Sequence, residues 1–242
     1  MSLRSTPVLV GLILLVTATC LRLGLWQVDR LHQRRAINAT SIAQRTLPSL
    51  SLNDPLPQGI ADPLPNRHVT AVGEFDHSQQ VVVRGRVYRE APGVHVVTPL
   101  RLTNSDTAVL VNRGFVPAPD AMTAEVDSLD EVGPRRVTGI AFAIPTDADG
   151  GTPLVHAGRT TWKRLDLAAL RARLSYPILD VYVLEEPDSG LPRYPRRLEP
   201  RPIDDGPHLS YAIQWFSFGT IALVGGVILA FHERKRARRG SR

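Results

Sequence analysis

One histidine in this sequence lies where it could bind a metal-containing cofactor. His208 opens an uncharged stretch of the chain, and Tyr211 and Trp215 follow it three and seven residues later. In a helix this spacing places all three side chains on one face. A haem iron needs an axial nitrogen and apolar walls, which an imidazole beside aromatic rings supplies. The alternative is a histidine that only hydrogen-bonds at the headgroup level of a membrane.

Other residues with chemical potential are scarce. The sequence has no Gly-x-Ser-x-Gly, Gly-x-Gly-x-x-Gly or His-Glu-x-x-His motif, and none of its 7 histidines is three or four residues from another. Its one cysteine, Cys20, excludes an internal disulfide framework and a Cys-based zinc or iron–sulfur site. We therefore expect a protein that is not an enzyme.

The positive charge is confined to the two ends of the chain. The net charge is +6; the tail 232–242 contributes five of these charges and Arg4 the sixth, so residues 5–231 sum to zero. This distribution argues against binding to nucleic acid. It is typical of a membrane protein, which keeps its basic residues on the cytoplasmic side.

Two apolar segments have the length of membrane spans. Residues 210–231 form 22 residues without a charge, which is enough to cross a bilayer and favours a membrane helix over a buried helix of a soluble protein. The first segment, 7–26, is interrupted by Arg22. It resembles the core of a signal peptide, but no clean cleavage site follows it, so we expect an uncleaved anchor with Arg22 at its outer end.

The charge pattern also predicts the topology. The dense basic tail directly follows the second apolar segment, whereas long loops cross membranes largely regardless of their charge. We therefore expect a two-pass protein of a bacterial-type plasma membrane, with both termini in the cytoplasm and the middle outside. Trp26 and Trp215 then lie at the same membrane interface, and Arg22 lies at a depth that suits a haem propionate.

Proline and hydrophobic periodicity divide the rest of the chain. Prolines cluster in 48–65 and 187–207, which indicates extended spacers. Between them, alternating or continuous apolar runs predict strands at 68–75, 81–88, 94–102, 108–116, 135–144 and 178–184, with a turn at 104–106. Asp166 before Leu167, Leu170 and Leu174 predicts one short capped helix.

The predicted architecture is therefore two transmembrane helices that flank a β-rich (α+β) antiparallel domain with one short helix. Arg113 lies in an apolar strand, so we expect it to pair with an acid or with backbone carbonyls, and Gly114 to meet a neighbour at close range. The expected segments are helix 7–26, linker 27–66, domain 67–186, linker 187–207, helix 208–231 and basic tail 232–242.

Several blocks of this sequence together resemble the surfeit-locus-one family of cytochrome oxidase assembly factors. They appear in order over about residues 22–218: Leu-Gly-Leu-Trp-Gln at 23–27, Val-Gly-Glu-Phe at 72–75, Pro-Gly-Val-His-Val-Val-Thr-Pro-Leu at 92–100, Val-Leu-Val-Asn-Arg-Gly-Phe-Val-Pro at 109–117, Thr-Trp at 161–162 and His-Leu-Ser-Tyr-Ala-Ile-Gln-Trp-Phe at 208–216. The family histidine corresponds to His208, although Pro207 precedes it where the family often has asparagine.

The resemblance implies a role in the maturation of haem–copper oxidases at the stage of subunit I, together with other oxidase assembly factors and within the lipid bilayer. Some bacterial members are thought to bind haem a and pass it on. On this basis we predict that His208 ligates the iron of haem a, with Trp26, Tyr211 and Trp215 as the wall and Arg22 at a propionate. The alternative function is a scaffold that holds oxidase subunits together without binding haem.

Overall fold

The computed structural model describes residues 6–55, 64–146, 153–156 and 159–240, and it contains two compact units. The first unit is built from the two ends of the chain, up to Thr40 and from Ile203 onward. The second unit is Ser41–Pro202. Each unit has its own architecture.

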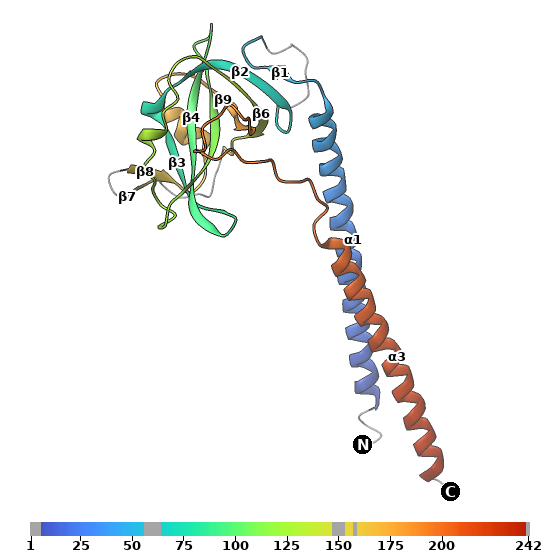
Figure 1. Ribbon diagram of the computed structural model, residues 1–242. Helices are drawn as coiled ribbons and strands as arrows, with labels where there is room; N and C mark the ends of the chain where they lie inside the picture. Colours follow the sequence, from blue (N-terminus) through green and yellow to red (C-terminus); the bar gives the residue numbers. More distant parts are fainter. Residues whose placement is uncertain (1–5, 56–63, 147–152, 157–158, 241–242) are drawn as a thin grey trace. The chain divides into compact units, whose positions relative to one another are not determined.

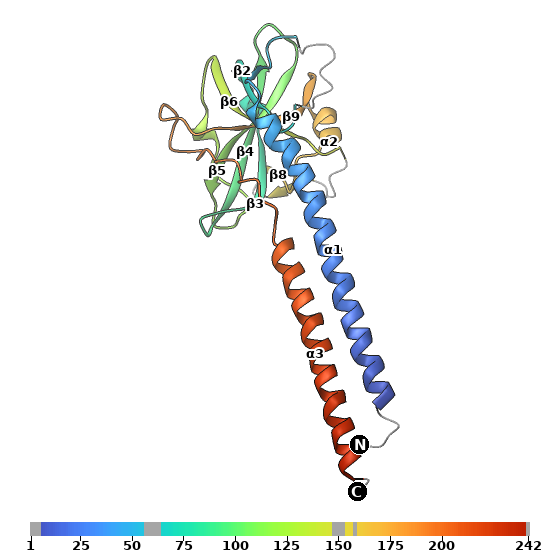
Figure 2. The ribbon, with the colours of Figure 1, turned by 90° about the vertical axis from the view of Figure 1, so that its right-hand side faces the viewer.

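The first unit is a pair of long antiparallel helices, α1 (Thr6–Thr46) and α3 (His208–Gly240), which run side by side in Figures 1 and 2. Their contact surface depends on glycine. A Cβ atom on Gly24 would overlap the Phe216 ring, and one on Gly226 would overlap Ile13. Both helices are long and apolar enough to span a membrane, by length and composition.

The buried positions of α1 recur at intervals of three and four residues, at Thr17, Cys20, Gly24, Gln27 and Leu31. This spacing keeps one stripe of a helix against a straight neighbour, as in a coiled coil. The outer faces of both helices carry exposed leucine, isoleucine and valine side chains. Exposed aliphatic residues of this kind are suited to a hydrocarbon environment.

The first half of the expected linker at 27–66 is helical, because α1 continues to Thr46. Residues 27–46 contain neither glycine nor proline, so nothing in them ends a helix, and polarity alone does not. The expected basic tail is helical for the same reason, since α3 extends to Gly240. The expected spacer at 187–207 has no helix or strand.

The second unit is a β-domain around a closed ring of strands. The described strands are β1 (Leu50–Ser51), β2 (His68–Phe75), β3 (Val81–Tyr88), β4 (Ala91–Leu102), β5 (Ala108–Pro117), β6 (Arg135–Ala143), β7 (Leu154–His156), β8 (Arg159–Trp162) and β9 (Ile178–Glu185). Their order is β1-β2-β6-β9-β5-β4-β3-β8-β7, and β2 also pairs with β4. The extra pairing closes β2, β6, β9, β5 and β4 into a ring, with β3, β8 and β7 extending from β4.

Alternation along β5 separates two of the three hydrophobic clusters of the domain. Val109 and Val111 face the cluster that also contains Leu100 and Val183, whereas Ala108 and Leu110 face a second cluster. The second cluster is covered by α2 (Leu167–Arg173), whose Leu167 and Leu170 are buried in it. Asp166 caps α2, as expected, by accepting a hydrogen bond of 2.8 Å from the Ala169 amide. Short 3₁₀ turns occupy His77–Gln79 and Asp127–Leu129.

The six expected strands and the turn at 104–106 are confirmed, with Asn104 in a left-handed conformation at φ 63°. The expectation of an antiparallel sheet is only partly correct. The pairs β1–β2, β3–β8 and β5–β9 are parallel, so the sheet is mixed. Periodicity reports which residues face the core and not the direction of the neighbouring strand, and β1, β7 and β8 are too short to produce a periodic signal.

Candidate functional site

His208 is the first residue of α3 and is half-buried. The helix begins here because the carbonyl of Pro207 accepts a hydrogen bond of 3.1 Å from the Tyr211 amide. Proline suits a helix start, since its missing N–H would have no partner there in any case. Pro207 therefore gives His208 a defined backbone at the entry of the helix.

The imidazole of His208 is held by a residue from the other helix. Its Nδ1 lies 2.9 Å from Oε1 of Gln27, a side chain that is itself buried in α1. With the amide oxygen of Gln27 against it, Nδ1 donates the hydrogen bond and Nε2 keeps its lone pair. Metal-binding histidines have this arrangement, in which one ring nitrogen donates to a neighbour and the other is left for the metal.

Polar contacts also fix the turn that leads into α3. The Asn38 side-chain amide donates to the carbonyl of Asp204 at 2.8 Å and to a carboxylate oxygen of Asp205 at 3.1 Å. Arg35 forms an ion pair of 2.8 Å with Asp205, and this hydrogen bond lowers the pKa of the Asp205 carboxyl. These contacts hold residues 204–205 on α1 and so set the level at which His208 meets Gln27.

The other residues expected at the haem site are exposed or half-buried. Trp26 is 52% exposed and Tyr211 is 48% exposed, while Trp215 is half-buried and packs edge-on against Phe218 at 6.2 Å. Within the described part of the chain, no hydrogen bond, ion pair or ring contact joins these residues or Arg22 to His208. The Gln27–His208 contact does place Trp26, the neighbour of Gln27, at the level of His208.

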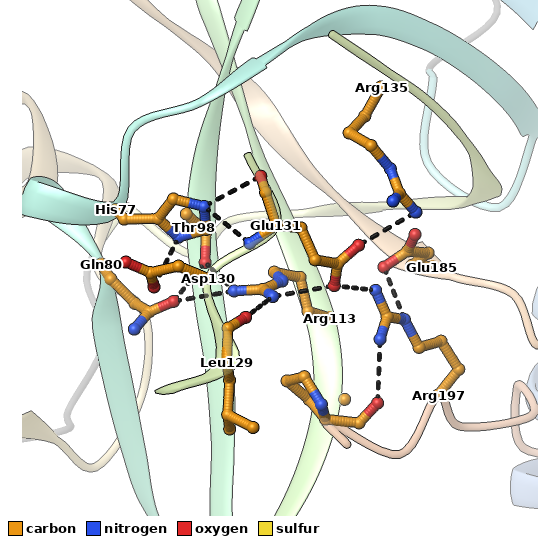
Figure 3. Close-up of polar contacts among 12 residues, drawn as sticks. His77, Gln80, Thr98, Arg113, Leu129, Asp130, Glu131, Arg135, Glu185 and Arg197 are labelled. Atoms are coloured by element: carbon orange, nitrogen blue, oxygen red, sulfur yellow. Dashed lines mark hydrogen bonds and ion pairs between the residues drawn. The ribbon is translucent and has the colours of Figure 1, made fainter. Parts of the chain in front are cut away.

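A second polar cluster lies in the β-domain, around Arg113 (Figure 3). The Arg113 side chain is fully buried at the end of the inward-facing row Val109, Val111, Arg113 on β5, and its guanidinium lies over the Phe75 ring at 5.2 Å. It donates to Gln80 at 3.0 Å, to Glu131 at 2.8 Å and to the carbonyl of Leu129. The expected pairing with an acid and a backbone carbonyl is confirmed.

Glu131 is the centre of this cluster. One of its oxygens, Oε1, accepts from Arg113 and, at 2.6 Å, from Arg197. Its other oxygen lies 2.9 Å from Arg135, and Arg197 also donates to Glu185 at 2.8 Å. Burial by itself would raise the pKa of Glu131, but the hydrogen bonds from Arg113 and Arg197 outweigh it and lower the pKa. For Glu185 burial prevails and the pKa is raised, although Arg197 opposes the shift.

His77 holds the loop that carries Glu131. Its Nε2 accepts a hydrogen bond of 3.1 Å from the Glu131 amide, and its Nδ1 lies 3.1 Å from a carboxylate oxygen of Asp130. The expectation for Gly114 is also confirmed, because a Cβ atom there would overlap the backbone of Arg196. The cluster thus joins β5, β9, the loop at 129–131 and the segment at 195–197, and its charges are compensated, which indicates a structural role.

Comparison with known proteins identifies the family of this chain. The profile of the SURF1 family matches residues 14–220. This chain belongs to the SURF1 family. A SURF1-like protein of Monosiga brevicollis is 30% identical over 224 residues, which cover 86% of this chain and 82% of the relative. A SURF1-like protein of Rickettsia felis is 27% identical over 90% of this chain and 95% of its own length, and Surfeit locus protein 1 of Rattus norvegicus is 27% identical over 84% and 70%.

The SURF1 match includes both polar clusters and excludes the basic end of α3. Sequence reasoning did not find Gln27, Glu131, Glu185 or Arg197 as members of these clusters. Gln27 is a polar residue at a buried position of the α1 stripe, and only the structure reveals that burial. Among the described residues of this SURF1 protein, no group of three or more His, Cys, Asp or Glu side chains is arranged to hold a metal ion.

Proposed function

We propose that this protein is a membrane-anchored, non-enzymatic assembly factor for haem–copper cytochrome c oxidase. The support is its membership of the SURF1 family, which is generally known for this role. In this proposal α1 and α3 cross the plasma membrane, both termini are cytoplasmic and the β-domain lies outside. The two apolar helices and the basic residues after Phe231 support that topology.

We further propose that the protein assists the delivery of haem a to oxidase subunit I. The observation that carries this proposal is the 2.9 Å contact between Gln27 and Nδ1 of His208, which leaves Nε2 available as an axial nitrogen. Bound haem a would supply the iron and an extended apolar ring. His208 would hold the iron, Trp26, Tyr211 and Trp215 would cover the ring, and Arg22 would bind a propionate.

The exposed rings of Trp26 and Tyr211 are compatible with transfer. A cofactor on an open helix surface can leave toward a second protein, whereas a cofactor in a closed cavity needs the cavity to open. The same exposure favours the alternative function, a scaffold that contacts oxidase subunits through these rings and binds no haem. Tyrosine and tryptophan are enriched at such protein contacts.

One experiment separates the two functions. The full-length protein is purified in detergent from cells that produce haem a, and its absorption spectrum and co-purifying proteins are recorded. A carrier shows a haem spectrum that His208→Ala abolishes or shifts while the protein remains in the membrane at normal amounts. His95→Ala, in the β-domain, should leave the spectrum unchanged. Subunit I without haem in the wild-type preparation would establish the scaffold instead.

A further inference from the structure

Two neighbouring arginines of the segment that precedes α3 have opposite environments. Arg197 is buried and is compensated by Glu131 and Glu185. Arg196 is half-buried, and its guanidinium lies 5.4 Å from the centre of the Tyr88 ring. Within the described residues, no carboxylate lies within ion-pair distance of Arg196.

The Arg196 guanidinium borders a surface pocket of about 200 Å³, which we call the arginine–aromatic pocket. Its principal lining residues are Tyr88, Arg89, Phe115, Pro117, Tyr194 and Arg196. The Tyr88 and Phe115 rings are 5.6 Å apart, and backbone hydrogen bonds of 2.8 Å in both directions join Arg196 to Phe115. The aromatic base of the pocket is therefore firmly built.

The positive charge of this pocket is not neutralised. The Arg89 guanidinium also lies over the Tyr88 ring, at 5.4 Å. Arg193 does not line the pocket, but its guanidinium lies 5.5 Å from the ring of Tyr194, which does. In the described part of the chain neither has a carboxylate within ion-pair distance, in contrast to the buried arginines of the Glu131 cluster. Two guanidinium groups of the pocket, those of Arg89 and Arg196, therefore lie over the Tyr88 ring without a carboxylate of the described residues at ion-pair distance.

The hairpin that presents Arg89 is also strained. The turn between β3 and β4 consists of Arg89 and Glu90, both in left-handed conformations with φ of 46° and 69°. A two-residue hairpin of this kind favours Asn-Gly, and side chains such as these adopt positive φ at a cost. Local strain of this kind is often retained where a side chain is needed for binding.

We propose that the arginine–aromatic pocket binds an acidic segment of a partner protein that carries an aromatic side chain beside its carboxylates. Arginine and tyrosine dominate the binding energy of protein interfaces, and planar guanidinium groups bind carboxylates in pairs of hydrogen bonds. The aromatic base accommodates the apolar part of the segment. This inference is independent of haem binding, because every residue involved belongs to the β-domain.

The test uses full-length protein in an uncharged detergent and a fluorescent synthetic peptide in which two Asp-Glu pairs flank a phenylalanine. A second peptide replaces each acid by its amide. We expect the acidic peptide to bind at least about tenfold tighter than the amide peptide, and its binding to weaken as salt increases. Equal binding of the two peptides, or no binding of either, would overturn the proposal.

Variants then locate the binding. Arg196→Gln and Arg89→Asn should each weaken acidic-peptide binding about fivefold or more. Arg101→Gln is the matched control, because Arg101 lies in the same way over a ring, 4.9 Å from Tyr176, at the other end of β4. If the two pocket variants bind like the wild type, the site is elsewhere and the inference fails.

The strained turn supplies a variant whose weaker peptide binding cannot result from unfolding. Arg89→Asn places a residue that tolerates φ of 46°, so the melting temperature should not fall while peptide binding weakens. Glu90→Asn relieves the strain at the neighbouring position and keeps Arg89, so binding should persist.

sn-Glycerol 3-phosphate tests whether the pocket binds a lipid headgroup instead. Pocket-dependent binding of this compound without binding of the acidic peptide would overturn the assignment of a protein partner.

Discussion

Glu131 and Arg197, 66 residues apart in the chain, form a buried hydrogen-bonded ion pair of 2.6 Å. The carboxylate oxygen that Arg197 contacts also accepts from Arg113. One carboxylate therefore joins a central strand, β5, to the last segment of the β-domain. The Glu131 side chain, which carries this charge, is almost completely hidden from water.

Glu131→Gln should destabilise the β-domain by about 3–5 kcal/mol. The substitution keeps the shape of the side chain but leaves Arg113 and Arg197 with less than their full counter-charge in a dry environment. Pulse proteolysis of the full-length protein across a urea series measures the loss. Arg135→Ala is the control, since Arg135 contacts the same carboxylate from a side chain that is 28% exposed, and it should cost less than about 1 kcal/mol. A near-wild-type midpoint for Glu131→Gln would show that the network is dispensable.

His95 should make the β-domain less stable in mild acid. Burial, followed by the charges of Arg86 and Arg201, lowers the pKa of His95 to about 4, and the Asn112 amide lies 3.3 Å from Nδ1, where it donates to the neutral ring. Since the unfolded histidine has a pKa near 6.5, the unfolded state binds more protons between these values and stability falls as the pH falls. From pH 8 to pH 5 the loss from this group is on the order of 2 kcal/mol.

The measurement is the difference between wild type and His95→Gln in urea midpoint at pH 8 and pH 5. The variant should show a smaller loss in acid, because its side chain does not titrate. His68 and His156, which lie near carboxylates, are present in both proteins and cancel in the comparison. Parallel pH profiles for the two proteins would mean that His95 titrates normally.

Gln27 should set the tautomer of His208. In protein labelled with ¹⁵N-histidine and prepared without haem, we expect His208 to carry its proton on Nδ1, because Oε1 of Gln27 lies 2.9 Å away. Gln27→Leu should shift the ring toward the other tautomer. If the wild type binds haem, the same variant should also change its spectrum or potential, since the neighbour of an axial histidine tunes the iron. An unchanged tautomer in Gln27→Leu would exclude this positioning role, whether or not haem binds.

Gly219→Cys should form a disulfide with Cys20 and thereby report the pairing of α1 with α3. A Cβ atom at Gly219 would lie 3.3 Å from the Cβ of Cys20, close to the separation that a disulfide requires. After mild oxidation of the detergent-purified protein, a thiol assay should find almost no free thiol. Gly225→Cys is the control, because no atom lies within 4 Å of a Cβ at that position, and it should retain two thiols. Two free thiols in Gly219→Cys would contradict the helix pairing.

Features that depend on near neighbours in the chain could be predicted from the sequence. The alternation at 68–75 and 108–116, the capping of Leu167 by Asp166 and the start of a helix at His208 are all local, and the structure has each of them. The environment of Arg113 could also be predicted, because a guanidinium buried in an apolar strand requires hydrogen-bond acceptors. Only the identity of its partner was missing.

The tertiary structure decided every feature that joins distant parts of the chain. No local pattern relates Glu131 to Arg197, Gln27 to His208, or β5 to its parallel neighbour β9. These contacts arise because closure of the ring of strands and pairing of the helices bring distant residues together. The sequence around each of these residues does not indicate its partner. The hydrophobic periodicity of a segment indicates which face of a helix or strand is buried, whereas tertiary packing selects the element against which that face is buried.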